Sequence, residues 1–520
     1  MSGAPQKSRL LELRQKYQGR YDAVSMLVYL SVVYVWSLWI YPLGRDYALL
    51  SGIHERPPLV VELLIECEAA CFQDRLIAYH VTNLALLYAS MLLLYRVTNL
   101  TLRGPSWMGT LAATLFMANP AYSEATLNLC GIVDLLPCVS ALAALLAYMI
   151  HTRAPSAAKR ELSVALFVVA VVLFPQNAGL ILVLLLYEAL VLKENSRSYL
   201  RLVPHLIVSL MGLVVYRDVL WTTGLAVTDT FAPLYFLFYP IGFLPENAKD
   251  FHDKPWLAWL GAVTTMVILY LIQRKSRSRA LLFGLLSMGA IRLLQPKAMV
   301  DPVHLVGGGQ LVLPGAFYAL VLSALFLRIM DHPKWRRTVI FVTTVLCLVF
   351  FGMGIRANFA WRHAGHAVQQ FQQQVYDEQR RNPDRPLGIL PDYQYYLGAP
   401  LRLSQAVAYE TPFSRSVLTV PLLPLHYERP PRLELTVMDW SSAGGTLLIR
   451  GQAPVALVCW PYALTTRDAR QVFEHCVARV EEVRPDGFSL RVEPKESPLP
   501  ERLLTFAENS AREEAGDNTE

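Results

Sequence analysis

A succession of long apolar runs, separated by short polar loops, fills most of this sequence up to residue 355. A helix of roughly 20 apolar residues crosses a bilayer core of about 30 Å, and shorter helices cross where the bilayer thins. Continuous runs exclude a membrane β-barrel, whose strands alternate apolar and polar residues. The runs are Ala23–Tyr41, Ile77–Tyr95, Trp107–Ala118, Asp134–Ile150, Leu162–Phe174, Ala178–Leu192, Leu202–Val219, Trp256–Ile272, Ala280–Leu294, Leu311–Leu327 and Thr338–Ile355. They predict an all-α polytopic membrane bundle of about 11 transmembrane helices.

Few charged residues interrupt these runs. Charged residues make up 17% of the chain and hydrophobic residues 54%, with a mean hydropathy of +0.34. Soluble domains are nearer a quarter charged, so the lipid bilayer is the expected surrounding of most of this chain. The basic residues stand in short clusters between apolar runs and form no aromatic-lined basic groove, which argues against a nucleic-acid partner.

Lysine and arginine set the expected orientation, because they accumulate in the cytoplasmic loops of membrane proteins. With a cytoplasmic N-terminus, the loops on that side hold 21 of these residues and the opposite loops hold 7. Eleven crossings then place the C-terminus outside. We expect a basic cytoplasmic segment at 1–22 and a transmembrane domain at 23–358 with a large outer loop at 43–76. No retention signal ends the chain, which favours a bacterial plasma membrane.

The apolar segment Phe231–Leu244 has two interpretations. Pro240 and Pro245 favour a re-entrant or interfacial segment whose two flanks lie outside. The alternative is a twelfth full span, which would place the C-terminal domain inside.

The composition changes at about residue 360. Polar residues become common, and short runs of β-forming residues follow between turn signals such as SAGG and RPDG. We expect an extracytoplasmic helix and a small β-rich domain over 359–505, then a disordered tail at 506–520. Cys459 and Cys476 lie in this domain and either form a disulfide in an oxidising compartment or are two separate thiols.

Polar residues that are unusual near a bilayer gather in the predicted outer segments. Asp46 lies in the first loop, Glu124 and Asp134 flank the turn before the fourth span, and Lys297 and Gln310 precede the tenth span. Ionisable groups at such positions are costly and mark candidate functional sites. A carboxylate in an outward-facing cavity can act as a general base on a hydroxyl group or hold a divalent cation.

The same carboxylates also have structural interpretations. Asp46 can cap a helix or pair with Arg45, and Glu124 can cap the helix that begins after Pro120.

Two stretches of the chain carry ordered motifs. The first, YHVTNL, and the second, NPAYSEATLNLCGIVDLL, contain Tyr79, His80, Asn83, Leu84, Pro120, Glu124, Ala125, Gly131, Asp134, Leu135 and Leu136. These motifs resemble those of the multi-spanning GT-C glycosyltransferases, and most of all their O-mannosyltransferase-like branch that carries tetratricopeptide repeats. Weaker similarity extends over most of residues 20–355. The resemblance implies a GT-C-like bundle.

Some motif residues depart from the family pattern. They are Ile132 in place of an arginine, Gln176 and Asn177 in place of a lysine–glutamate pair, Gln310 in place of an arginine, and Asn119 and Tyr122 in place of two histidines. The departures remove basic residues of the type that binds phosphate, and no tetratricopeptide repeat follows.

The resemblance implies an inverting transferase that moves a sugar from a polyprenyl-phosphate donor to an acceptor outside. It implies Asp46 as the base or part of a metal site, and Glu124 and Asp134 as residues that orient the acceptor or metal. Lys297, Gln310 and His80 are the implied donor-binding residues. A divalent cation is a possible cofactor, although no cofactor is firmly implied.

Two other functions compete with this one. The missing basic residues favour a catalytically inactive scaffold that binds a protein partner through its β-rich tail. A transporter is the third hypothesis, for which the sequence shows one broken segment and no internal repeat.

Overall fold

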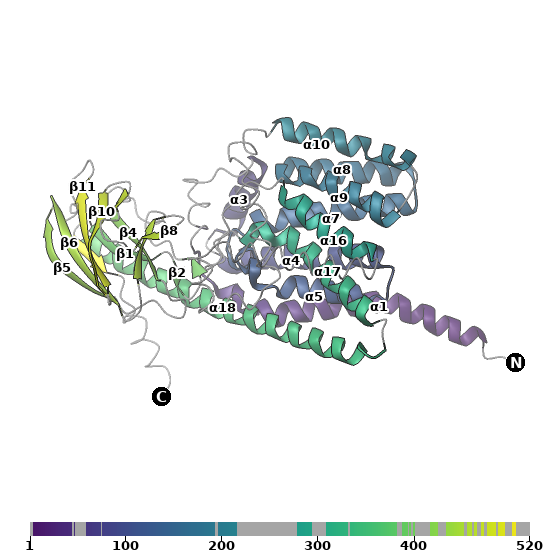
Figure 1. Cartoon of the computed structure of the whole chain (residues 1–520), viewed down its shortest axis with the longest axis horizontal. Helices are drawn as coiled ribbons and strands as arrows, with labels where there is room; N and C mark the ends of the chain where they lie inside the picture. The colour runs from purple at the N-terminus through teal and green to yellow at the C-terminus, as the bar shows by residue number, and fades with distance from the viewer. Residues whose placement is uncertain are drawn as a thin grey trace.

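The computed structural model of the chain describes residues 4–43, 46, 59–73, 75–192, 196–215, 278–293, 308–330 and 333–381, and the strands between 387 and 505. These residues form a helical bundle and a β-sheet region. The long helix α18 (Arg336–Arg381) joins them, and the N-terminus lies at the opposite end of the bundle (Figure 1). The end from which α18 continues to the strands is called the β-side end below.

The bundle consists of α-helices with short 3-10 and π segments between them. Its helices are α1 (Ala4–Tyr34), α3 (Leu59–Phe72), α4 (Leu76–Leu102), α5 (Trp107–Ala118), α6 (Ser123–Leu127), α7 (Ile132–Arg153), α8 (Ala157–Leu173), α9 (Leu180–Leu186), α10 (Val203–Val215), α16 (Arg279–Leu293), α17 (Val312–Met330) and α18. Its shorter segments are η1 (Val35–Trp39), η2 (Pro120–Tyr122), η3 (Pro175–Gly179), the π-helix η4 (Tyr187–Leu192), η5 (Ser196–Leu202) and η8 (Gly308–Leu311).

The predicted span Trp256–Ile272 and the segment Phe231–Leu244 lie outside the described residues. The described residues of the other predicted spans are helical except at a few span ends, such as Ile40, Tyr41 and Phe174, and the ends of Leu202–Val219 and Ala280–Leu294 lie outside the described residues. In the described part, five helices are long and apolar enough to cross a membrane. Three shorter apolar helical segments accompany them: Trp107–Ala118, Asn177–Leu192 and Tyr199–Val215.

The outward surface of the bundle is apolar. On α10, Leu206, Ile207, Leu210 and Met211 are 45–62% exposed. Such a surface suits lipid, because contact between this much exposed hydrocarbon and water would be unfavourable. Together with the apolar helices, it indicates an integral membrane protein.

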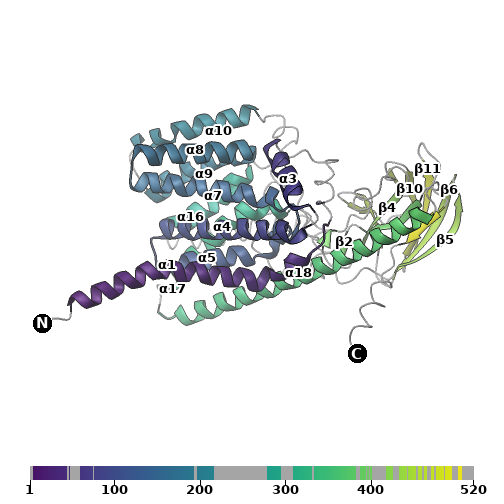
Figure 2. The same ribbon diagram turned by 180° about the vertical axis from the view of Figure 1, so that it is seen from behind.

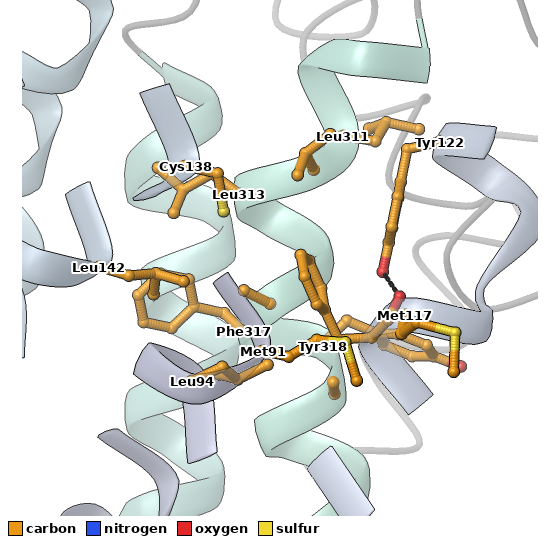
Figure 3. Packing of buried hydrophobic residues seen from close by; sticks show 14 of the residues in the cluster. Met91, Leu94, Met117, Tyr122, Cys138, Leu142, Leu311, Leu313, Phe317 and Tyr318 are labelled. Carbon is orange, nitrogen blue, oxygen red and sulfur yellow. Dashed lines mark hydrogen bonds between the residues drawn. The ribbon is translucent and has the colours of Figure 1, made fainter. Parts of the chain in front are cut away.

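Small residues let the helices approach each other closely. Gly284 of α16 lies against α17, where a Cβ atom would stand 2.6 Å from a methyl group of Val321. Gly109 of α5 likewise lies against Tyr95 of α4. In lipid, where the hydrophobic effect does not drive helices together, van der Waals packing at such close approaches stabilises their association. Met91, Leu142 and Phe317 fill the space between α4, α7 and α17 (Figure 3).

Two helices run across the expected domain boundaries. Helix α1 begins at Ala4, so the basic N-terminal segment and the first span form one helix. Helix α18 runs through residue 358 without a break, and Asn358 of this helix donates a hydrogen bond to the Val33 carbonyl (3.2 Å). Figure 2 shows α18 passing alongside α1 before it reaches the strands.

The predicted β-rich region is confirmed. One sheet has the order β12-β1-β4-β7-β8 and another has the order β5-β6-β11-β10-β9, with a small β2-β3 pair. The strands are β1 (Leu387–Tyr393), β2 (Tyr395–Tyr396), β3 (Ala399–Pro400), β4 (Val417–Pro424), β5 (Leu433–Ser441), β6 (Gly444–Gly451), β7 (Val455–Cys459), β8 (Tyr462–Leu464), β9 (Arg470–Val472), β10 (Cys476–Arg484), β11 (Gly487–Pro494) and β12 (Arg502–Thr505).

The second five-stranded sheet is antiparallel throughout, whereas β1 runs parallel to β4 and β12. On β11 the alternate residues Phe488, Leu490 and Val492 are buried, as the period of a strand requires, and Val480 of β10, which pairs with Leu490, is buried with them. Cys459 ends β7 and Cys476 begins β10, in different sheets; their side chains lie outside the described part of the structure.

Candidate functional site

The candidate site lies at the β-side end, where α5 gives way to η2, α6 and α7. Asn119 accepts a hydrogen bond from the Ala121 amide (2.9 Å) and so starts η2, with Pro120 at its first position. The polar residues of this segment, Asn119, Ser123 and Glu124 among them, are at most 3% exposed. The chain therefore buries a polar segment at the end of an apolar bundle.

Asp46 is held by backbone amides from two parts of the chain. Its Oδ2 atom accepts from the Leu43 amide (3.0 Å) and from the Leu129 amide (3.0 Å), and its Oδ1 atom accepts from the Cys130 amide (2.9 Å). The residue is 1% exposed. Hydrogen bonds from N–H groups to a carboxylate stabilise its ionised form.

Asn83 of α4 holds the same turn from the other side. Its amide nitrogen donates to the carbonyls of Asn128 (2.7 Å) and Leu129 (3.1 Å). A Cβ atom on Gly131 would lie 2.2 Å from the Ala125 carbonyl oxygen and 2.9 Å from the Asn83 amide nitrogen. Glycine is therefore required where this turn meets α4.

Glu124 lies on α6, directly before that turn. Its Oε1 atom accepts from the Asn128 side chain at 3.4 Å, and its backbone carbonyl accepts from the Asn128 amide at 2.9 Å. The carboxylate sits in the first turn of the short α6, where N–H groups that have no acceptor within the helix favour negative charge.

Asp134 lies in the first turn of α7 and packs against η8. A Cβ atom on Gly309 would stand 2.2 Å from Cγ of Asp134, so the carboxylate lies directly against the backbone there. Segment η8 also contacts η2 and α6. Glu124, Asp134 and Gln310 are thus brought to one region of the structure from three elements.

Arg292, near the end of α16, was not predicted as a site residue. Its Nη1 atom donates to Oε1 of Gln310 at 3.1 Å, and the residue is 1% exposed. It lies inside the predicted span Ala280–Leu294. An ionisable residue inside an apolar run was the signal that could have found it.

His80 lies one turn before Asn83 on α4. Its Nε2 atom lies 3.0 Å from the Ile40 carbonyl oxygen, so this nitrogen carries the proton and donates. Its Nδ1 atom is buried and finds no hydrogen-bond partner among the described residues. His80 therefore holds the chain at Ile40, shortly before Asp46. Its contact with the lipid-linked sugar donor stays a prediction.

The departures from the family motifs have local structural reasons. Ile132 is 7% exposed and packs with Ile65, Cys130 and Phe174, an apolar cluster that would not stabilise a cation. Asn177 donates to the carbonyls of Pro137 (3.2 Å) and Ala170 (3.2 Å) and so ties three helical segments together. The side chain of Gln176 lies outside the described part of the structure.

The predicted lysine of the site, Lys297, lies outside the described residues. Among the described residues, no group of three or more His, Cys, Asp or Glu side chains could hold a metal ion. The three amides on Asp46 also occupy positions that a cation would need. The described residues do not form the donor set expected for a divalent cation.

Helix α3, in the predicted first outer loop, packs on α4 through Phe72 and Tyr79, with ring centroids 5.2 Å apart. Burial raises the pKa of the Glu68 carboxyl on this helix to about 7. Glu66, two residues before Glu68 on the same helix, is exposed.

No protein-family model matches the sequence, and no curated protein matches it. A comparison with solved structures matches the chain to an archaeal oligosaccharyltransferase, AglB from Archaeoglobus fulgidus in complex with an inhibitory peptide and a dolichol-phosphate, with TM-score 0.41 and 11% identity over 78% of this chain. It also matches the apo form of the Archaeoglobus fulgidus oligosaccharyltransferase, with TM-score 0.40 and 11% identity over 80% of this chain. The chain spans 65% of the length of each.

Proposed function

We propose that the protein is a membrane glycosyltransferase of the GT-C-like kind. It transfers a sugar from a polyprenyl-phosphate donor to an acceptor hydroxyl on the extracytoplasmic side. The observation that supports this best is the arrangement of Asp46, Glu124 and Asp134. These carboxylates come from separate elements and are gathered at one end of an apolar bundle.

The transfer needs one carboxylate as a general base. In an inverting reaction the acceptor oxygen forms a bond to the anomeric carbon while the bond from that carbon to the phosphate oxygen breaks. The acceptor proton passes to the carboxylate, and the carrier phosphate leaves with its electron pair. Glu124 and Asp134 are the acceptor-side residues in this proposal, and Asp46 belongs to the same site. No step is assigned to a metal ion, because the described donor set does not fit one.

The leaving phosphate needs positive charge or hydrogen-bond donors. In this proposal Lys297 contacts the phosphate, as the sequence predicts, with Gln310 and His80 on the donor side. Gln310 is oriented by the buried guanidinium of Arg292. The apolar bundle accommodates the polyprenyl chain alongside its exposed apolar surface.

Donor binding can be tested on detergent-purified protein by titrating a panel of polyprenyl-phosphate hexoses and following the melting temperature. A ligand of the folded state raises it by mass action. We expect stabilisation by at least one donor and a weaker effect in Lys297→Ala, with the exposed Glu66→Gln as a matched control. If no donor raises the melting temperature, the result contradicts the proposal and favours the scaffold alternative.

A further inference from the structure

The Asp46 carboxylate is bound to the turn formed by Asn128, Leu129 and Cys130, named the 128–130 turn here. Two of its three amide donors, Leu129 and Cys130, belong to this turn and lie 83 and 84 residues away in the sequence. The third, Leu43, belongs to the segment that carries Asp46 itself. The carboxylate therefore joins the end of the α1–η1 segment to the α6–α7 connection.

This bonding limits what Asp46 can do chemically. A carboxylate offers about four lone-pair positions, and three of them here accept backbone N–H groups. A general base must direct a lone pair at the substrate hydroxyl within hydrogen-bond distance. Both oxygens of Asp46 are already directed at the backbone, and the residue is 1% exposed.

The 128–130 turn connects the two other carboxylates of the site. Glu124 lies four residues before Asn128, and Asp134 lies four residues after Cys130. Asn83 holds the carbonyls of this turn while Asp46 holds its amides, so the turn is fixed from both sides. Any displacement of the turn changes the separation of Glu124 and Asp134.

We propose that Asp46 is a positioning residue that fixes the 128–130 turn and thereby sets Glu124 and Asp134 for the reaction. The inference rests on the proposed transferase function and refines it, because it assigns the acceptor proton to Glu124 or Asp134. Asp46 acts through the backbone of the turn and does not touch the substrate.

Asp46→Asn separates this role from that of a base. An asparagine side chain keeps one acceptor oxygen but points an NH2 group at an amide that must donate, so at least one bond to the turn is lost. Asn83→Ala removes the two bonds on the other side of the same turn. The two variants therefore act on one element by different routes.

The first measurement is hydrogen exchange of the peptide that contains Leu129 and Cys130, and it needs no activity. We expect exchange at these amides to be about 10-fold faster or more in Asp46→Asn, because each loses or weakens a bond to a charged acceptor. The exposed Glu66→Gln should leave the exchange unchanged. Unchanged exchange in Asp46→Asn overturns the inference whether or not the protein is a transferase.

The second measurement is kcat and its pH profile in wild type, Asp46→Asn, Asn83→Ala and the double variant. We expect kcat in Asp46→Asn to fall about 100-fold, as a misplaced group permits, while the acidic limb of its pH profile remains. The double variant should lie within about 3-fold of the slower single variant, since both act through one turn. Loss of the acidic limb in Asp46→Asn, or multiplicative losses in the double variant, overturns the inference and makes Asp46 the base.

The two measurements also separate failure of the inference from failure of the proposed function. A wild-type protein that transfers no sugar contradicts the transferase proposal and the catalytic part of this inference. Faster exchange in Asp46→Asn would in that case still show that the carboxylate holds the turn.

Discussion

The side chain of Gln310 accepts a hydrogen bond from the guanidinium of Arg292, with 3.1 Å between Oε1 and Nη1. This contact links α16 to the segment η8 that lies against Asp134. It supplies a buried cation close to the candidate site, from a helix where the sequence motifs do not place one.

Gln310→Ala should destabilise the protein. The loss of one hydrogen bond from the buried Arg292 guanidinium costs about 1 kcal/mol of unfolding free energy, within the range for helix contacts in membranes. Thermal melts in detergent measure this, with Gln373→Ala as control, because Gln373 is also hydrogen-bonded to a charged side chain, donating to Asp377 (3.3 Å), but on an exposed face. Equal effects of the two variants would show that the Arg292–Gln310 contact contributes nothing specific.

Gly309→Ala should reduce transfer at least about 10-fold, because the added methyl group displaces the Asp134 carboxylate from η8. The Cβ atom would stand 2.2 Å from Cγ of Asp134. Gly352→Ala is the matched control, since a Cβ atom on Gly352 meets nothing within 4 Å. The measurement is the initial rate of sugar transfer at saturating donor concentration. Similar rates in both variants would show that Asp134 does not belong to the site.

Tyr148→Phe should lower the unfolding free energy by about 1–3 kcal/mol, because a buried carboxylate loses the hydrogen bond from the Tyr148 hydroxyl. The Tyr148 hydroxyl donates to Glu188, which is 1% exposed and lies in the π-helix η4. Tyr376→Phe, at a 49% exposed position, should have no measurable effect. A denaturation series on both variants measures the difference, and a neutral Tyr148→Phe would show that Glu188 is satisfied without this bond.

Stability should fall as pH rises from about 4.5 to about 7, because burial raises the pKa of Glu68 to about 7. In this window the folded state keeps the proton that the unfolded state releases, so each rise in pH favours unfolding. Glu68→Gln should remove this part of the pH dependence and melt higher than wild type above pH 7. Melting curves between pH 4 and pH 8 test this, and parallel curves for the two proteins would contradict it.

The membrane helices were predictable from the sequence because a helix that crosses the hydrocarbon core of a bilayer must be a long apolar run, and such runs are visible in the sequence. Gly284 and Gly109 then set how closely the helices pack, which periodicity alone does not give. Helix α3 was missed because its acidic residues, Glu62 and Glu66, break the apolar pattern that identifies spans.

The residue types of the candidate site stand out in the sequence, whereas their arrangement does not. Asp46, Glu124 and Asp134 stand out as acidic residues next to apolar runs, and the structure places them at one end of the bundle. The Asp46 carboxylate accepts from the backbone amides of Leu129 and Cys130. These contacts could not be predicted, because every residue other than proline has a backbone N–H group. Arg292 was hidden for a different reason, because a single charge does not interrupt an apolar run.

Sugar transfer by reconstituted protein tests the central claim most directly. Polyprenyl phosphate carrying a radiolabelled hexose is mixed with wild type, Glu124→Gln, Asp134→Asn or Glu66→Gln, with membrane extract as the source of acceptors, and the label that leaves the lipid carrier is counted. We predict transfer by wild type and Glu66→Gln, with a loss of about 100-fold or more in at least one of the other two variants, as expected for removal of a general base. Transfer that is absent in wild type, or equal in all four proteins, would contradict the account.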